Sequence, residues 1–321
     1  MPIEFGLYVE AQEGVTWADW HALARHAEDL GFASLQCSVH LTSLQAPGRW
    51  ALDPWPVMTA LALWTRRIHF GLHVLPVTFY HPALVARLAA ALDRLSGGRF
   101  RLGLGAGRDR HEHDAFGLPF LPYSERVAML GEAVEVIRLL WGGEPVTFQG
   151  RWYRLHGAQA VPTPQAPHLG LGGNGDPILR LAAARADEWC TTGSSTEALR
   201  GRLQRLDALA GAARRSPTSI VRTLMNGVVV GRTWAELEQR ARRMGELAPD
   251  LAPWSPRAII DRLAADWHWW VGTPEAVAGQ VTEALRTGIH QVLFQVFDFR
   301  DLAAIDLLAR EVLPRLKPPC P

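Results

Sequence analysis

Short apolar runs alternate with longer amphipathic stretches along almost the whole chain. The apolar runs, each as long as a buried strand, fall at residues 3–9, 33–39, 68–75, 99–105, 168–172, 188–192, 220–230 and 291–296. Helical periodicity, with apolar residues three and four apart, marks residues 17–30, 54–65, 82–95, 124–141, 177–185, 196–214, 234–247, 274–287 and 302–316. Strands that alternate with helices pair in parallel, and eight such units predict an α/β protein with a (β/α)8 TIM barrel.

The first strand-to-helix turn favours this barrel over a doubly wound sheet. Residues 10–14 read Glu-Ala-Gln-Glu-Gly, without the G-x-G-x-x-G that holds dinucleotide phosphates. Two segments interrupt the alternation: an excursion at about 142–167, which contains a β-ribbon turning at Gly150, and an insertion at about 248–271. Asn226-Gly227 indicates a bulge in the seventh strand. We expect a single domain over residues 1–321.

Composition removes several classes of protein. The chain has 33 Lys and Arg against 32 Asp and Glu, a net charge of +1, which argues against a nucleic-acid binder. The three cysteines have no CxxC spacing, so a disulfide framework and a structural zinc site are both unexpected, and Cys37 and Cys190 read as small buried hydrophobes. There is no leader-like N-terminus and no apolar run long enough for a membrane span, so we expect a cytoplasmic protein.

Candidate chemistry lies at the carboxyl ends of the strands, where barrel enzymes place their active sites. His40 follows the second strand and could move a proton near neutral pH, or simply hydrogen-bond within its loop. A second histidine, His73, ends the third strand. Glycine-rich turns follow the fourth strand (Gly105, Ala106, Gly107) and the fifth strand (Gly172, Gly173, Asn174, Gly175).

The turn after the fifth strand either binds an anion or is a plain strand-to-helix connection. Its glycines open backbone amides toward solvent at a helix N-terminus, although Asp176 adds a negative charge there. Thr191 and Thr192, which end the sixth strand, offer hydroxyls to the same ligand, and the serines that follow them could instead cap a helix.

Two other segments have a structural alternative that we favour. Residues 108–114 contain His111 and His113, whose spacing of two makes them diverge on a helix, so we expect a solvated, ion-paired loop and no metal site. The aromatic run at residues 267–270 could wall an apolar substrate pocket, but packing of the insertion onto the barrel is the commoner outcome.

Several of these motifs together resemble the bacterial luciferase-like oxidoreductases that use a flavin or a deazaflavin. The similarity is carried by the sequences at residues 67–71, 76–83, 91–99, 103–107, 112–119, 148–153, 172–175, 183–187 and 271–275, which span almost the whole chain. The resemblance is strongest to the branch that uses the deazaflavin coenzyme F420, and FMN-using relatives come next.

The resemblance implies a cofactor ring in the barrel mouth, against a bulge in the third strand. That bulge often carries a non-prolyl cis peptide, which would fall at His73-Val74. By the same resemblance His40 lies near the reacting ring, and the turn at Gly172–Gly175 takes the cofactor phosphate. The implied activity is hydride transfer between F420 and a small organic substrate; an FMN-dependent monooxygenase and a non-catalytic cofactor-binding protein are the alternatives.

Two residues depart from the pattern of that branch. Val39 stands where an Asp usually precedes the histidine, and Arg108 stands where Trp or an acid is common. F420 also carries an acidic tail beyond its phosphate, for which Arg180, Arg108 and His268 are the candidate cations. We expect a small-molecule substrate, no nucleic-acid or membrane partner, and leave a homodimer open.

Overall fold

A closed barrel of parallel strands forms the centre of the computed structural model, which describes residues 3–43, 45–46 and 48–316. Within these residues eight strands pair in the order β1, β2, β3, β4, β7, β8, β9, β11, and β11 pairs back with β1. Their bounds are β1 (Glu4–Val9), β2 (Ser34–Cys37), β3 (His69–Pro76), β4 (Phe100–Gly105), β7 (Leu169–Gly172), β8 (Glu188–Thr192), β9 (Val221–Val230) and β11 (Gln291–Gln295). The predicted TIM barrel is confirmed.

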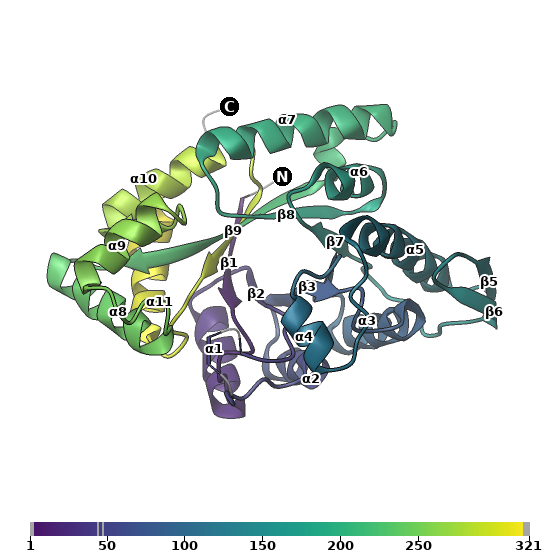
Figure 1. Ribbon diagram of the computed structural model, residues 1–321, viewed down its shortest axis with the longest axis horizontal. Helices are drawn as coiled ribbons and strands as arrows, with labels where there is room; N and C mark the ends of the chain where they lie inside the picture. The colour runs from purple at the N-terminus through teal and green to yellow at the C-terminus, as the bar shows by residue number, and fades with distance from the viewer. Residues whose placement is uncertain (1–2, 44, 47, 317–321) are drawn as a thin grey trace.

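Helices surround the strands (Figure 1). They are α1 (Trp17–Asp29), α2 (Pro54–Trp64), α3 (Pro82–Ser96), α4 (Arg110–Ala115), α5 (Tyr123–Trp141), α6 (Asp176–Arg185), α7 (Thr196–Ala212), α8 (Trp234–Leu247), α9 (Pro256–Ala265), α10 (Pro274–Leu285) and α11 (Leu302–Leu307). After α11 the chain continues as a π-helical turn (Leu308–Val312) and a 3₁₀ turn (Leu313–Arg315), and another 3₁₀ turn (Pro217–Ser219) precedes β9. Local signals start several helices: Thr16 forms a capping box with Asp19, and α2 and α3 begin at prolines.

Two segments outside the eight-stranded barrel have secondary structure of their own. The excursion forms an antiparallel hairpin of β5 (Val146–Gln149) and β6 (Arg154–Ala158), which lies beyond α5 at one side of Figure 1. The insertion contributes α9 and the short strand β10 (Trp270–Gly272), neither of which the sequence predicted, and β10 pairs with the end of β9. A satellite apolar cluster that includes Met244, Ile259 and Leu263 joins α9 to α8.

Strand irregularity falls in β3 and not in β9. The register of β9 with β11 runs without a shift from Thr223 to Gly227, so the bulge predicted at Asn226-Gly227 is wrong. Gly227 instead makes room for the indole of Trp269, since a Cβ at Gly227 would lie 1.9 Å from that ring. The register of β3 with β4 shifts between Leu72 and Leu75, as the resemblance implied.

Candidate functional site

A cavity of about 400 Å³ opens at the carboxyl ends of the barrel strands. All the site residues predicted from the sequence line this mouth cavity except Gly175, namely His40, His73, Val74, Gly105, Ala106, Gly107, Gly172, Gly173, Asn174, Thr191 and Thr192. A larger hollow of about 550 Å³ lies over α8, but charged side chains line it and already pair with one another, such as Arg243 with Glu246 and Asp298. The mouth cavity is therefore the candidate active site.

His40 forms a pair with a carboxylate that the sequence did not single out. The imidazole Nδ1 lies 2.8 Å from Oε2 of Glu112, and the other oxygen of Glu112 accepts a hydrogen bond from the backbone N–H of Leu41 at 2.6 Å. Glu112 is 1% exposed, so α4 presents its carboxylate to the loop after β2 and not to solvent. Nε2 of His40 has no partner among the described residues and is left for a ligand.

The solvated, ion-paired loop expected at residues 108–114 is wrong in two respects: the segment forms α4, and Glu112 and His113 are buried, whereas Arg110 and Asp114 form an exposed ion pair as expected. Asp109 caps α4 by accepting from the N–H of Glu112, and one face of this short helix turns Glu112 and His113 into the protein. His113 contacts the Thr78 hydroxyl at 2.7 Å and the Asp109 carbonyl at 2.5 Å, whereas His111 is exposed. Because the segment is helical, His111 and His113 lie on different faces, one exposed and one buried. A loop prediction could not show this.

The bulge in β3 forms the floor of the mouth cavity. The His73-Val74 peptide is cis, as the resemblance implied, and Val74 points toward the glycines of the neighbouring strands. A Cβ at Gly105 would lie 2.6 Å from the Val74 side chain, and one at Gly172 would lie 2.8 Å from it. These two glycines therefore make room for Val74, so their role is to support the bulge.

Polar donors gather where β7 and β8 end. Asn174 accepts from the Thr191 hydroxyl at 2.6 Å, and its amide nitrogen lies 3.3 Å from the Thr192 hydroxyl. Arg202 on α7 reaches the hydroxyls of Thr191 and Ser194 at 3.3 Å each. Arg202 is not among the site residues predicted from the sequence, although its spacing of seven from the α7 cap at Ser195 places it two turns along the same face.

Of the candidate cations predicted from the sequence, Arg108 lines the mouth cavity, and Arg180 and His268 do not. Asp176 pairs with Arg180 at 2.8 Å and with Arg205 at 2.6 Å, so its charge at the α6 N-terminus is compensated. Arg108 is exposed on the rim of the mouth cavity and has no ion-pair partner among the described residues. His268 does not line the cavity.

The aromatic residues of the insertion pack as the commoner alternative predicted. Trp270 is buried against Phe294 with ring centroids 5.8 Å apart, and Trp269 lies against Phe297 at 6.4 Å. Trp267 is exposed beside Trp269. These three tryptophans are absent from the lining of the mouth cavity.

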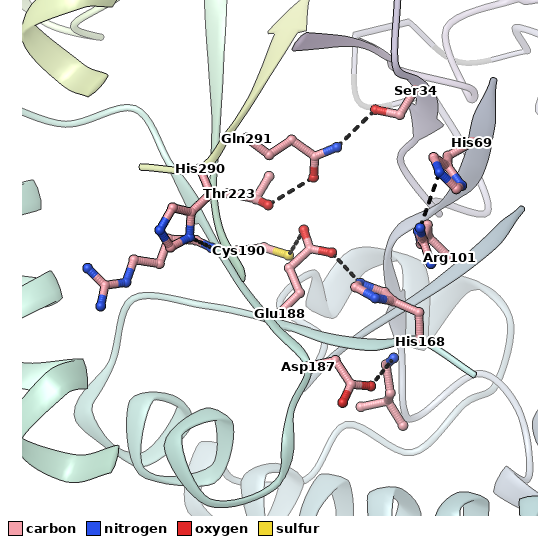
Figure 2. A network of polar contacts seen from close by, with 12 residues as sticks. Ser34, His69, Arg101, His168, Asp187, Glu188, Cys190, Thr223, His290 and Gln291 are labelled. Atoms are coloured by element: carbon pink, nitrogen blue, oxygen red, sulfur yellow. Dashed lines mark hydrogen bonds and ion pairs between the residues drawn. The ribbon is translucent and has the colours of Figure 1, made fainter. Parts of the chain in front are cut away.

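A buried polar network continues below the mouth, inside the barrel (Figure 2). Glu188 accepts from His168 Nε2 at 2.6 Å and from the Cys190 thiol at 3.2 Å. Burial alone would raise the pKa of Glu188, but the hydrogen bond and charge of His168 outweigh burial and lower it to about 2. From Thr223, which also lowers the pKa of Glu188, a further chain of hydrogen bonds runs through Gln291 to Ser34. Cys190 is buried as expected, yet it is also a hydrogen-bond donor.

Two further buried groups, Tyr8 and His73, line the mouth cavity. Burial raises the pKa of Tyr8, and Glu10 raises it further, so the phenol at the cavity wall is a neutral donor. Burial lowers the pKa of His73, and the charge of Glu188 opposes that shift. Among the described residues, His73, Glu188 and Cys190 are the one His/Cys/acid group whose potential ligand atoms all lie within 4.8 Å of one another.

The fold and the site together define a barrel enzyme whose mouth is built around a bulged strand and a histidine–carboxylate pair. Residues 2–291 match the model of the luciferase-like monooxygenase family, and the chain belongs to that family. No helix in the part of the chain that the structure describes is both long and apolar enough to cross a membrane.

Several relatives within this family carry names that specify F420. The F420-dependent glucose-6-phosphate dehydrogenase of Amycolatopsis mediterranei is 29% identical over 312 residues, which cover 92% of this chain and 93% of that protein. The F420-dependent hydroxymycolic acid dehydrogenase of Mycobacterium tuberculosis is 32% identical over 315 residues, covering 92% and 84%. The solved structure of an F420-dependent secondary alcohol dehydrogenase in complex with an F420-acetone adduct has a TM-score of 0.83 at 22% identity, and covers 99% of this chain and 100% of that one. At that identity the last likeness shows the fold alone.

Proposed function

We propose that this protein is an oxidoreductase that transfers a hydride between coenzyme F420 and the hydroxyl- or carbonyl-bearing carbon of a small organic substrate. The observation that carries the proposal is the His40–Glu112 pair at the edge of a cavity floored by the β3 bulge. The names of the curated relatives support the choice of coenzyme and of reaction.

The residues present fit a ring with a phosphate-bearing side chain. The floor at His73 and Val74 offers a platform for a flat ring, and the neutral Tyr8 hydroxyl stands at the wall. Hydroxyl and amide donors of Thr191, Thr192 and Asn174 face the same cavity, and charge-assisted hydrogen bonds from such donors suit a phosphate. When bound, F420 supplies the acceptor or donor of the hydride.

In this proposal His40 is the catalytic acid or base for the substrate oxygen. The Glu112 carboxylate accepts from Nδ1–H, which fixes the imidazole tautomer and leaves Nε2 as the acceptor toward the cavity. Nε2 then takes the hydroxyl proton of an alcohol as the hydride leaves its carbon, and returns a proton to the oxygen in the reverse direction. The backbone N–H of Leu41 holds the second oxygen of Glu112, so the pair keeps its orientation.

A binding titration tests the coenzyme assignment. Purified protein titrated with F420 and with FMN, each at two salt concentrations, is expected to bind F420 more tightly, and the difference shrinks as salt screens contacts to the acidic tail. Tighter FMN binding would move the protein to the flavin monooxygenase alternative. Binding of F420 without its reduction by any alcohol would favour a non-catalytic cofactor-binding protein.

The remaining assignments belong to the same proposal. We infer one domain over residues 1–321, in which the barrel supplies the site and the hairpin and insertion cover its outside. We further infer a small-molecule substrate and a cytoplasmic location, and a homodimer is the assembly to test by light scattering.

A further inference from the structure

An ionic side chain inside the barrel is the feature that the proposed reaction does not use. TIM-barrel interiors are normally filled by layers of branched apolar residues. Glu188 is 4% exposed, and alternation along β8 directs Glu188 and Cys190 into the same interior face. Both side chains pack against Gly170 on the adjoining strand, where a Cβ would lie at ordinary contact distance, 3.5 Å from the Glu188 carboxylate and 3.6 Å from the Cys190 sulfur.

The carboxylate of Glu188 lies between two sets of residues at different heights in the barrel. His168 precedes β7 and lines a cavity of about 160 Å³ at the amino-terminal ends of the strands. His73 and Cys190 line the mouth cavity, and their ligand atoms lie within 4.8 Å of the carboxylate. Figure 2 shows the carboxylate with Cys190 on one side and His168 on the other. Glu188 itself lines the amino-terminal cavity, and its carboxylate lies within 4.8 Å of the ligand atoms of the mouth-lining His73 and Cys190.

We propose that Glu188 is a positioning residue whose charge, next to His73, lowers the reduction potential of the cofactor bound above it. This inference rests on the proposed function, because it requires a redox ring on the β3 bulge. Accepting a hydride brings two electrons and one proton to the ring, which gains one unit of negative charge. A fixed negative charge nearby, in a medium of lower dielectric constant than water, opposes that gain.

The test compares reduction potentials of bound F420 in variants that change one charge. Glu188→Gln keeps the size of the side chain, and we expect it to raise the equilibrium ratio of reduced to oxidised cofactor about tenfold, which is about 30 mV for a two-electron couple. The potential is read by equilibration with a reference dye, with EDTA present so that no metal ion at His73, Glu188 and Cys190 contributes.

Asp187, the residue next to Glu188 in the sequence, provides a matched control. Asp187 undergoes the same chemical change in Asp187→Asn, but it pairs with Arg138 of the outer helix α5 at 2.9 Å and accepts from the Leu169 N–H at 2.8 Å. Its replacement is expected to leave the potential unchanged. A general disturbance of β7 and β8 would instead move the potential in both variants.

A second variant removes the same charge by another route and does not depend on the folding of the first. His168→Asn withdraws the hydrogen bond and charge that keep Glu188 ionised, so burial favours the neutral carboxyl and the ratio of reduced to oxidised cofactor should rise, as in Glu188→Gln. If Glu188→Gln binds the cofactor with an unchanged reduction potential, this inference alone is overturned. It is also overturned if neither variant folds, because the His168–Glu188 pair would then be a purely structural requirement. Failure of the unsubstituted protein to bind F420 would overturn the proposed function together with it.

Discussion

The two ends of the barrel carry the same types of polar residue, but these residues differ in how many of their hydrogen-bonding atoms have a protein partner. At the amino-terminal end, one oxygen of Glu28 accepts from the backbone N–H groups of Arg66, Arg67 and Ile68, at 2.8, 2.7 and 3.1 Å, and ties α1 to the start of β3. Arg99 there donates to the carbonyls of Ala62, Thr65, Ile68 and Ser96 and to the Thr65 hydroxyl. Every one of these contacts joins one element to another.

At the mouth, polar groups keep one side free for a ligand. Nδ1 of His40 hydrogen-bonds to Glu112, and Nε2 has no partner among the described residues. Arg108, on the rim of the mouth cavity, forms no ion pair with any described residue. A histidine or a carboxylate is therefore a candidate for chemistry when its second hydrogen-bonding atom faces a cavity. Where all the hydrogen-bonding atoms of a side chain contact other elements, the same residue type contributes to stability instead. This division is expected for the two ends of a TIM barrel.

The largest effect should come from His40→Ala. Removing the proton carrier should lower turnover by about 100-fold or more, the usual contribution of general acid–base catalysis, while the F420 dissociation constant changes little. The measurement is the rate of F420 absorbance change with an alcohol substrate. His111→Ala, which changes an exposed histidine of α4, is the control. Full turnover in His40→Ala with cofactor bound would remove His40 from the mechanism.

At the other end, Glu28→Gln should lower stability and leave turnover per folded molecule intact. Charge-assisted bonds become neutral ones, at a cost of about 2 kcal/mol in the free energy of unfolding. Burial raises the pKa of Glu28, but the N–H donors lower it overall, so this stabilisation is present above the unfolded pKa of about 4.3 and fades as pH falls below it. Urea unfolding at pH 7 and pH 4 measures both effects.

The exposed neighbour Asp29 supplies the control for that measurement. Asp29→Asn lies on the same helix and should change the free energy of unfolding by less than about 0.5 kcal/mol. If the difference in the free energy of unfolding between Glu28→Gln and the unsubstituted protein were the same at pH 7 and pH 4, a role for the charge would be contradicted.

Much of this contrast could be predicted from the sequence, because strand ends follow from periodicity. Alternating runs place His40, His73, Gly172 and Thr191 at one end of a barrel, and the structure brings all four to one cavity. The cis peptide and the β3 bulge came from the family resemblance, since no local pattern in the apolar sequence at residues 68–75 signals either.

The partners of these residues could not be predicted in the same way. Glu112 is 72 residues from His40, and His168 is 20 residues from Glu188, so each pair exists only once the barrel has closed. Charged residues in a sequence read as solvated by default, because most are. Only tertiary packing shows that Glu112 and Glu188 are buried.

Glu112→Gln tests the carboxylate partner of His40 at the mouth. The amide presents either an oxygen or an NH2 group to Nδ1, so His40 loses its single tautomer and its fixed orientation, and we expect about a tenfold loss in kcat with little change in the F420 dissociation constant. Asp114→Asn on the exposed face of α4 is the matched control. If Glu112→Gln lowered stability like Glu28→Gln and left kcat unchanged, the pair would belong with the structural contacts of the other end.

The smallest effect concerns the cofactor side chain at the β7–β8 edge of the mouth. Arg202 lies 3.3 Å from the hydroxyls of Thr191 and Ser194, so Arg202→Ala should weaken F420 binding about fivefold at low salt, the range of a partly exposed charge contact. The loss should shrink at higher ionic strength, because exposed charges are screened. Arg180→Ala is the control, since Arg180 is exposed and already paired with Asp176 at 2.8 Å. Fluorescence titration at two salt concentrations measures both variants, and a larger loss in Arg180→Ala would place the anionic side chain of the cofactor along α6 instead of α7.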